Sequence, residues 1–399
     1  MRESRRNSLV QLCQELLRRP SVSGREGDVA CYVAQTMRTL GYDSVSVDSY
    51  GNVLGRIQFS PRGEKLLLTA QMDHVEVGDA AEWSRYPFGA FVEGGRIYGR
   101  AASDQKGALA AMILAAAFLK ADREHSLAGE LVVGAAVHQE TFEGVASQAI
   151  GEAVSPTCVI VGESSGLALE RGQRGRAEIR VDTFGKMAHS SHPECGVNAA
   201  ETMAGLISFL RRNFIPGRDP FLGEGILVLT SILSSPYPNS GAVPEKCSAV
   251  FDRRLLPEET PEGVLRQVRD LIGRAAEEVP GLEAKISFPV REGKCWTGAP
   301  IRGRTFAPAW MMPEGEPFLG RLARALSDEG ICTGISPRPG FGTNGCHYAA
   351  ERKIPTAIFG PSRHELVHRV DEFIDVEQLE GACRGYCAMA GALLSSSCE

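Results

Sequence analysis

The sequence lacks the features of a membrane protein or a secreted protein. No apolar run approaches the roughly 18 residues of a membrane-spanning helix, and residues 1–19 contain no signal-peptide core. The eleven cysteines include no CxxC pair, and an odd number cannot all pair within the chain. We therefore expect a cytoplasmic protein with mostly buried, reduced thiols, including Cys383 and Cys387 on one face of a predicted helix.

The sequence also lacks an excess of positive charge and any low-complexity segment. A net charge of −6 provides no electrostatic attraction for nucleic acid or an anionic membrane, so neither is expected as a partner. The chain is 43% hydrophobic and 23% charged, as is usual for a folded globular protein. Its 399 residues exceed the roughly 250–300 at which a single core stops growing, which predicts two domains.

The first part of the chain alternates helical and strand patterns. Leucines at 9, 12, 16 and 17 have helical spacing, and the pattern stops at Pro20. Further helices are predicted at 28–40 and 106–119, and strands at 51–56, 65–71, 130–138 and 157–162. Because strands and helices alternate with crossover-sized spacing, we predict an α/β domain with a largely parallel sheet.

The pattern changes near residue 175. Strands are predicted at 177–184, 225–233, 247–255 and 282–288, and helices at 198–212 and 261–279. This β-α-β-β-α-β order is the ferredoxin-like split pattern. From about residue 294 the chain returns to the first domain, with helices at 317–328 and 375–394 and a strand at 356–359. We therefore predict a discontinuous larger domain, 1–174 and 294–399, with an inserted domain, 175–293.

Polar residues follow several of the predicted apolar strands, and one group precedes the Ala-rich helix. These positions are Gln71, Asp73, His74, Asp104, His138, Gln139, Glu140 and Glu163. In open α/β sheets, ligands collect at the carboxyl ends of the strands. Two or three carboxylates and a histidine, either His364 or His368, make a suitable set of donors for zinc or a similar divalent ion.

Five motifs spread along the chain point to one family. They are PSVSG at 20–24, EW and YPF within 82–88, GRIYGRAASDQKG at 95–107, DRRLLP at 252–257 and GTNG at 342–345. Together they resemble the di-zinc hydrolase family of acetylornithine deacetylase, succinyl-diaminopimelate desuccinylase and carboxypeptidase. The resemblance covers nearly the full length. It implies a zinc-peptidase-like α/β domain with an inserted ferredoxin-like domain that mediates dimerisation and closes over the site as a lid.

The resemblance also implies a role for each matching residue. Asp104 would bridge two metal ions, with Glu140 and His368 completing one site and Glu163 and residue 71 the other. Asp73 would orient the first ligand from behind it. In the inserted domain His189 would reach a partner subunit's site and polarise the scissile carbonyl. Substrate contacts would come from Arg254, Asn344 and Gly345. The resemblance implies a homodimer with one or two Zn²⁺ ions per chain, for which Mn²⁺ or Co²⁺ are alternatives.

Two positions depart from the family pattern. Gln71 replaces a metal-binding histidine, and Gln139 replaces the glutamate that acts as general base. An amide oxygen is a weak zinc ligand, so the site of Gln71 and Glu163 should bind metal poorly, hold a harder ion or be empty. An amide cannot accept and return a proton near neutral pH, and general acid–base catalysis contributes roughly 10²–10⁴-fold to a rate. We therefore expect an altered mechanism.

Nearby histidines offer two ways to compensate for these changes. Alternation along the strand places His138 on the same face as Glu140, where it could approach the metal or act as a base. His74 would point away from Asp73 if its strand continues, and a structural role is favoured for both histidines. For His192 and His347 a surface or substrate-contact role is favoured.

Three functions follow from these observations. The first is a metal-dependent enzyme that hydrolyses the amide of a small carboxylate-bearing molecule, such as an N-acyl amino acid or dipeptide, with a substitute base. The second is an acyl-transfer or amide-forming enzyme in which a substrate amine replaces water. The third is a catalytically inactive binding or regulatory homologue. We predict an enzyme with one good metal site and an atypical mechanism.

Overall fold

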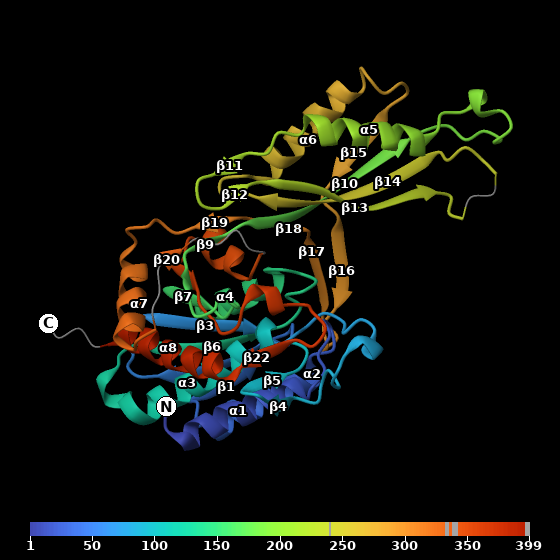
Figure 1. Cartoon of the computed structure of the whole chain (residues 1–399). Coiled ribbons are helices and arrows are strands. Elements are labelled where there is room, and N and C mark those ends of the chain that lie inside the picture. Colours follow the sequence, from blue (N-terminus) through green and yellow to red (C-terminus); the bar gives the residue numbers. More distant parts are fainter. Residues whose placement is uncertain (239–240, 332–334, 337–341, 396–399) are drawn as a thin grey trace. The chain divides into compact units, whose positions relative to one another are not determined.

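The chain forms two compact units. The computed structural model describes residues 1–238, 241–331, 335–336 and 342–395 (Figure 1). The larger unit comprises Met1–Gln173, Glu292–Gly303 and Met311–Glu399, and the smaller unit comprises Arg174–Arg291 and Arg304–Trp310. The catalytic role of one unit and the dimerisation and lid roles of the other stay predictions.

An eight-stranded mixed sheet forms the centre of the larger unit, in the order β1-β2-β6-β3-β7-β21-β8-β20. In chain order these strands are β1 (Ser44–Val47), β2 (Val53–Gln58), β3 (Lys65–Gln71), β6 (Glu130–Ala136), β7 (Cys158–Val161), β8 (Leu169–Glu170), β20 (Ile335–Ser336) and β21 (Thr356–Ile358). The four neighbours β6, β3, β7 and β21 are parallel, whereas β2 is antiparallel to β6 and β8 to β21. The predicted parallel arrangement thus describes the centre of the sheet.

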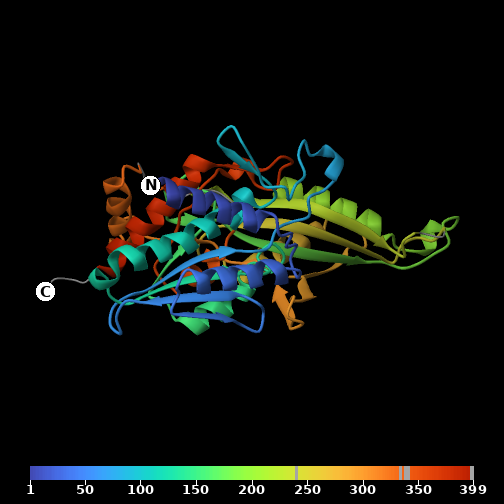
Figure 2. The same ribbon diagram turned by 90° about the horizontal axis from the view of Figure 1, so that it is seen from below.

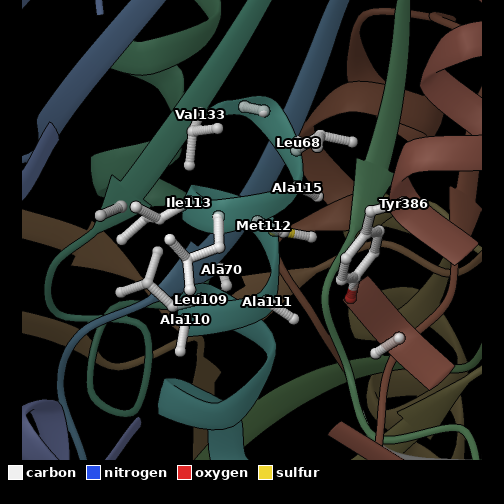
Figure 3. Packing of buried hydrophobic residues seen from close by; sticks show 14 of the residues in the cluster. Leu68, Ala70, Leu109, Ala110, Ala111, Met112, Ile113, Ala115, Val133 and Tyr386 are labelled. Carbon is white, nitrogen blue, oxygen red and sulfur yellow. The ribbon is translucent and has the colours of Figure 1, made fainter. Parts of the chain in front are cut away.

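Among the described residues of the larger unit, six α-helices cover this sheet on both faces, as the view from below shows (Figure 2). They are α1 (Glu3–Leu17), α2 (Gly27–Thr39), α3 (Gly107–Arg123), α4 (Val145–Val154), α7 (Pro317–Asp328) and α8 (Val376–Leu394). Helix α3 packs against α1 and α8, while α2 packs on β1 and β2 and α4 on β6. Because α3 is rich in alanine, β3, β6 and α8 approach it closely. Figure 3 shows its Met112 among Leu68, Val133 and Tyr386, all within one core.

Short elements complete the larger unit. A three-stranded sheet is formed by β22 (Phe373–Asp375), β5 (Arg96–Tyr98) and β4 (Phe91–Glu93). Strand β9 (Gly172–Gln173) also belongs to this unit, whereas β16 (Val290–Lys294), β17 (Pro300–Arg304) and β19 (Trp310–Met311) each cross a boundary between the two units. Single helical turns are η1 (Ala80–Glu82), η2 (Ala102–Lys106), η3 (Glu124–Ser126), η5 (Cys346–Glu351) and η6 (His364–Leu366). Turn η2 leads directly into α3 and carries Asp104.

The smaller unit has the predicted ferredoxin-like order. Its elements are β10 (Gly175–Phe184), α5 (Ala199–Asn213), β13 (Ile226–Ser235), β14 (Lys246–Leu255), α6 (Pro261–Ala275) and β15 (Glu283–Ser287). The strands pair antiparallel in the order β13-β14-β10-β15, and α5 and α6 share a core with them. Shorter elements are η4 (Pro193–Cys195), β11 (Arg218–Asp219), β12 (Gly223–Glu224) and β18 (Phe306–Ala307), which pairs with β10.

Three features of the larger unit differ from the sequence-based expectation. Strand β1 was not predicted, because SVSV is short, polar and largely exposed. Helix α4 was not predicted either. It begins after Gly144, which has a φ of 81° and offers no side-chain cap, so the usual start signal is missing. Finally, β6 ends at Ala136, two residues before the predicted end at His138.

The cysteine prediction is confirmed for the described residues. Nine cysteines are free thiols, and six of these are buried. Cys332 and Cys398 lie outside the described residues. Among the helices that could be searched, none is long and apolar enough to cross a membrane.

Candidate metal centre

The carboxyl ends of the central parallel strands bring distant polar residues together. Gln71 is the last residue of β3 and lies opposite Ala136, the last residue of β6. On the other side of β3, Thr69 pairs with Val161, the last residue of β7. The segments with Asp73, Gln139, Glu140 and Glu163 therefore leave the sheet at one edge, as predicted from the sequence.

Three predicted ligands converge at this edge. Single donor atoms of Asp104, Glu140 and His368 all lie within 4.8 Å of one another. The Nε2 atom of His368 is 3.0 Å from Oδ2 of Asp104 and 3.2 Å from Oε1 of Glu140. Two carboxylates and an imidazole suit Zn²⁺, and also accommodate Mn²⁺ or Co²⁺. The residues present thus fit one divalent ion.

Burial and neighbouring groups shift the pKa values of two of these ligands. Burial raises the pKa of Glu140 to about 8, and the nearby Asp104 carboxylate adds to the rise. Hydrogen bonds to Asp104 and Glu140 raise the pKa of His368 to about 10. The His368 imidazole is therefore protonated when no metal ion is bound, and a divalent ion would compete with that proton.

Gln71 and Glu163 lie at the positions where the resemblance implies a second ion, and both have hydrogen-bond partners within the protein. Nε2 of Gln71 donates to Oδ1 of Asp104 at 2.8 Å and to Oε1 of Glu140 at 3.1 Å. Its Oε1 is buried and has no hydrogen-bond partner among the described residues. Glu163 accepts hydrogen bonds from Nε2 of Gln105 and from the backbone N–H of Ser164, and burial raises its pKa well above the usual range.

Asp73 supports the turn that carries the ligand Glu140. Its carboxylate accepts hydrogen bonds from the backbone N–H of Gln139 at 3.1 Å and of Glu140 at 3.0 Å. The Oγ of Ser23 donates a third, at 2.7 Å. Burial raises the pKa of Asp73 to about 6. Asp73 thus holds the backbone of this turn, and its role in orienting the first metal ligand stays a prediction.

The alternation argument for His138 is wrong, because β6 ends before this residue. His138 has a φ of 57°, and the chain turns there instead of continuing as a strand. Its Nδ1 lies 3.0 Å from Oγ1 of Thr141, and its Nε2 lies 3.3 Å from the Lys294 carbonyl oxygen. Burial lowers the pKa of His138. Both ring nitrogens therefore have partners away from the three converging ligands.

His74 has the contacts of a structural histidine. Its Nε2 accepts a hydrogen bond from the Ser21 backbone N–H at 2.8 Å, so Nδ1 carries the proton and donates to the Val75 carbonyl at 2.7 Å. Burial lowers the pKa of His74 to about 4, which keeps the ring neutral. Both nitrogens are used, and neither is available to replace a ligand at position 71.

The candidate substrate residues lie in both units. In the smaller unit His189 is exposed, with Nδ1 2.7 Å from Oγ of Ser191, and Nε of Arg254 is 2.8 Å from Oδ1 of Asp252. In the larger unit, Oδ1 of the buried Asn344 accepts from the Gly144 N–H at 3.1 Å. Remaining candidates have these contacts: Gly345 N–H to Oγ1 of Thr343, His192 to Glu194, His347 to Glu351, and His364 to Glu170.

Two residues near the ligands were missed by sequence reasoning. Gln105, next to Asp104, is 2% exposed and contacts Glu163. Glu372 is 1% exposed; it pairs with Arg100 and accepts backbone hydrogen bonds from Ser103 and Asp104. Gln105 lies within the motif at 95–107, directly after Asp104, and this position could have identified it as a residue near the metal ligands. Nothing in the local sequence distinguishes Glu372 from a surface carboxylate.

Comparisons with known proteins agree with this geometry. Residues 67–392 match the model of Peptidase family M20/M25/M40. The uncharacterized protein YgeY of Escherichia coli (strain K12) is 31% identical over 370 residues, which cover 91% of this chain and 89% of that protein. A succinyl-diaminopimelate desuccinylase of Cereibacter sphaeroides is 28% identical over 387 residues, or 93% of this chain and 95% of the relative.

A solved structure shows the same fold. The YXEP protein of Bacillus subtilis, described as a dinuclear metal binding peptidase, has a TM-score of 0.72 at 15% identity and covers 98% of this chain and 99% of its own. The resemblance inferred from the motifs and the predicted fold class are thus confirmed. The chain belongs to Peptidase family M20/M25/M40.

Proposed function

We propose that the protein is a metal-dependent enzyme acting on the amide, or a related carbonyl, of a small carboxylate-bearing molecule such as an N-acyl amino acid or a dipeptide. The observation that carries the proposal is the convergence of Asp104, Glu140 and His368 on one point. Membership of a peptidase family and likeness to a desuccinylase support amide chemistry. Arg254, Asn344 and Gly345 are proposed to bind the substrate, and His189 to polarise its carbonyl.

The residues around this point would divide the work as follows. A divalent ion bound by Asp104, Glu140 and His368 would act as a Lewis acid on the substrate carbonyl. Asp73 fixes the backbone of Gln139 and Glu140, and Gln139 directly precedes the ligand Glu140 in the sequence. The side-chain amide of Gln139 can donate or accept a hydrogen bond but cannot take up a proton. Activation of water at this position therefore lacks a base.

The missing base favours a second candidate, acyl transfer to an amine. Water must lose a proton to become a good nucleophile, whereas a neutral amine attacks directly and gives up its proton only afterwards. In such a transfer the amine nitrogen forms a bond to the acyl carbon, the donor's bond to that carbon breaks, and the proton ends on the leaving group. The substitution at Gln139 would remove hydrolysis as a competing reaction.

Incubating the metal-loaded protein with N-acyl amino acids, with and without added amines, tests both candidates. Products are quantified by liquid chromatography and mass spectrometry. We expect transfer product in excess of free acid, and both should disappear after chelation of the metal. Free acid alone would reject transfer and retain hydrolysis. Neither product with any of the acyl donors would favour the binding or regulatory homologue instead.

We also propose that the protein is a cytoplasmic homodimer, joined through β13. This strand lies at one edge of the smaller unit's sheet, and its sequence ILVLTSILSS contains no charge. Val228 and Ile232 are 51% and 50% exposed. An uncharged, apolar edge strand is prone to pair with another chain, and antiparallel pairing with the same strand of a second copy satisfies two-fold symmetry. The free thiols support a reducing compartment.

Replacing Ile232 with lysine is expected to convert the dimer into a monomer. A charge on the pairing strand would be desolvated in the interface and would face its own copy across the two-fold axis. Size-exclusion chromatography with light scattering measures the mass. The matched control is Ile215→Lys, because Ile215 is 81% exposed and lies outside the strand. A dimeric Ile232→Lys variant, or a monomeric wild type, would contradict the proposed interface.

A further inference from the structure

The two glutamines at the metal centre form a connected pair. Gln105 follows Asp104 directly, and its Oε1 accepts a hydrogen bond from the backbone N–H of Gln71 at 3.3 Å. Its Nε2 donates to Oε2 of Glu163 at 2.5 Å. Both side chains are almost fully buried, at 1% exposure for Gln71 and 2% for Gln105. The side-chain amide of Gln105 is therefore held between the backbone of Gln71 and the carboxylate of Glu163.

Together these amides reach the three carboxylates that would line a two-ion centre. Gln71 donates to Asp104 and Glu140, and Gln105 donates to Glu163. On Asp104 the two contacts use different oxygens, because Nε2 of His368 is 3.0 Å from Oδ2 while Gln71 donates to Oδ1. On Glu140 both residues contact Oε1. The bridging Asp104 carboxylate thus has one oxygen facing the imidazole and the other facing an amide.

The side of the centre near Glu163 does not fit a second ion. Two ions in such a centre stand about 3.5–4 Å apart and share a bridging carboxylate. Here the second oxygen of Asp104 already accepts an amide hydrogen, and Glu163 is occupied by Gln105 and Ser164. The amide atom of Gln71 that faces the carboxylates is Nε2, which has no lone pair for a metal ion.

Burial explains why amides can serve in the place of an ion. Buried carboxylates without partners are costly, so a site that loses a cation needs donors in its place. Amide N–H groups supply such donors without adding a full charge. We propose that Gln71 and Gln105 take the place of the second metal ion, so that the centre binds a single divalent ion. This inference rests on the metal ligation proposed above and concerns the number of ions, not the reaction.

Metal content of the purified full-length protein tests the inference independently of activity. The protein is stripped with a chelator, reloaded with Zn²⁺ or Co²⁺, separated from free metal by gel filtration and analysed by mass spectrometry of the elements. We expect about one equivalent per chain. With Co²⁺, the electron paramagnetic resonance signal should be that of an isolated ion. Two tightly bound equivalents with a coupled signal would overturn the inference while leaving the metal-dependent function intact. No bound metal would overturn both.

A double variant tests whether a second metal ion can be bound once the two amides are removed. Gln71→His with Gln105→Ala restores an imidazole at position 71 and frees Glu163 from its amide partner. The expected metal content rises from about one to about two equivalents per chain, since both ligands of the second site become available. The matched control is Gln11→His, which adds a histidine on the exposed surface of α1 and should stay at one. A folded double variant that still binds one ion would count against the inference. If the variant does not fold, the metal content of the wild-type protein alone tests the inference.

Discussion

Replacing Gln139 with glutamate is expected to turn the protein into an efficient amide hydrolase. The two side chains have nearly the same shape, and Asp73 holds the backbone N–H at this position, so the new carboxylate should lie where the amide lies now. Unlike the amide, a carboxylate can accept a proton from water and return it to the leaving amine. General acid–base catalysis of this kind is worth about 10²–10⁴-fold, and the gain should be in kcat more than in KM. Initial rates of hydrolysis of N-acyl amino acids measure it.

The control for this variant changes the charge equally at a distance from the centre. Gln35 is exposed on α2, and Gln35→Glu should leave hydrolysis unchanged. Metal content must be measured for all three proteins, because a gain in rate is interpretable only at equal loading. Unchanged hydrolysis in metal-loaded Gln139→Glu would show that the proton acceptor of this protein lies elsewhere.

The residues that the sequence made predictable are those tied to strand ends. Gln71 and Glu163 follow apolar runs, and parallel pairing of β3 with β7 places the ends of both runs at one edge. The inserted domain was predictable for a related reason, since buried and half-buried residues alternate along all of β14 and most of β10. The predicted strand position of His138 was wrong, because periodicity cannot show where a strand ends. The chain turns after Ala136, and the side chain leaves the expected face.

The contacts of Gln105 and Glu372 could not be predicted, because their partners are distant in the sequence and the family pattern assigns no role to either residue. Gln105 donates a hydrogen bond to Glu163, which is 58 positions away, and Glu372 accepts one from the backbone of Ala101, which is 271 positions away. Local patterns carry no information about such contacts, because they depend on the completed fold. A glutamate in the run DEF at 371–373 has the pattern of a surface charge before a strand. Only the packed structure identifies it as a buried group.

Replacing Glu372 with alanine is expected to destabilise the larger unit by about 3–5 kcal/mol. Arg100 and Glu372 form an ion pair of 2.8 Å, and their side chains are 3% and 0% exposed. Removing the carboxylate leaves a buried guanidinium without its counter-charge and also removes the acceptor for the N–H groups of Ala101 and Ser103. Urea unfolding of the metal-free protein measures the loss. Tryptophan fluorescence is a suitable signal, because the Arg100 guanidinium lies 4.9 Å from the centre of the Trp83 ring.

The same carboxylate connects stability to metal binding, and a second pair of variants separates the two effects. Oε1 of Glu372 accepts a hydrogen bond from the backbone N–H of Asp104, so Glu372 also helps to position a predicted metal ligand. Mutation of a residue that supports a metal ligand typically lowers metal affinity about 10–100-fold. Arg100→Met should cost stability comparably, because it leaves the carboxylate buried and unpaired. Combining it with Glu372→Gln should recover part of that loss, since neither partner then carries a charge and an amide oxygen still faces the backbone N–H groups. If the double variant regains stability and binds metal as tightly as wild type, Glu372 positions Asp104 through its hydrogen bonds. If Glu372→Ala lowers the free energy of unfolding by less than about 1 kcal/mol, the Arg100–Glu372 pair does not stabilise the larger unit as its burial and contacts indicate.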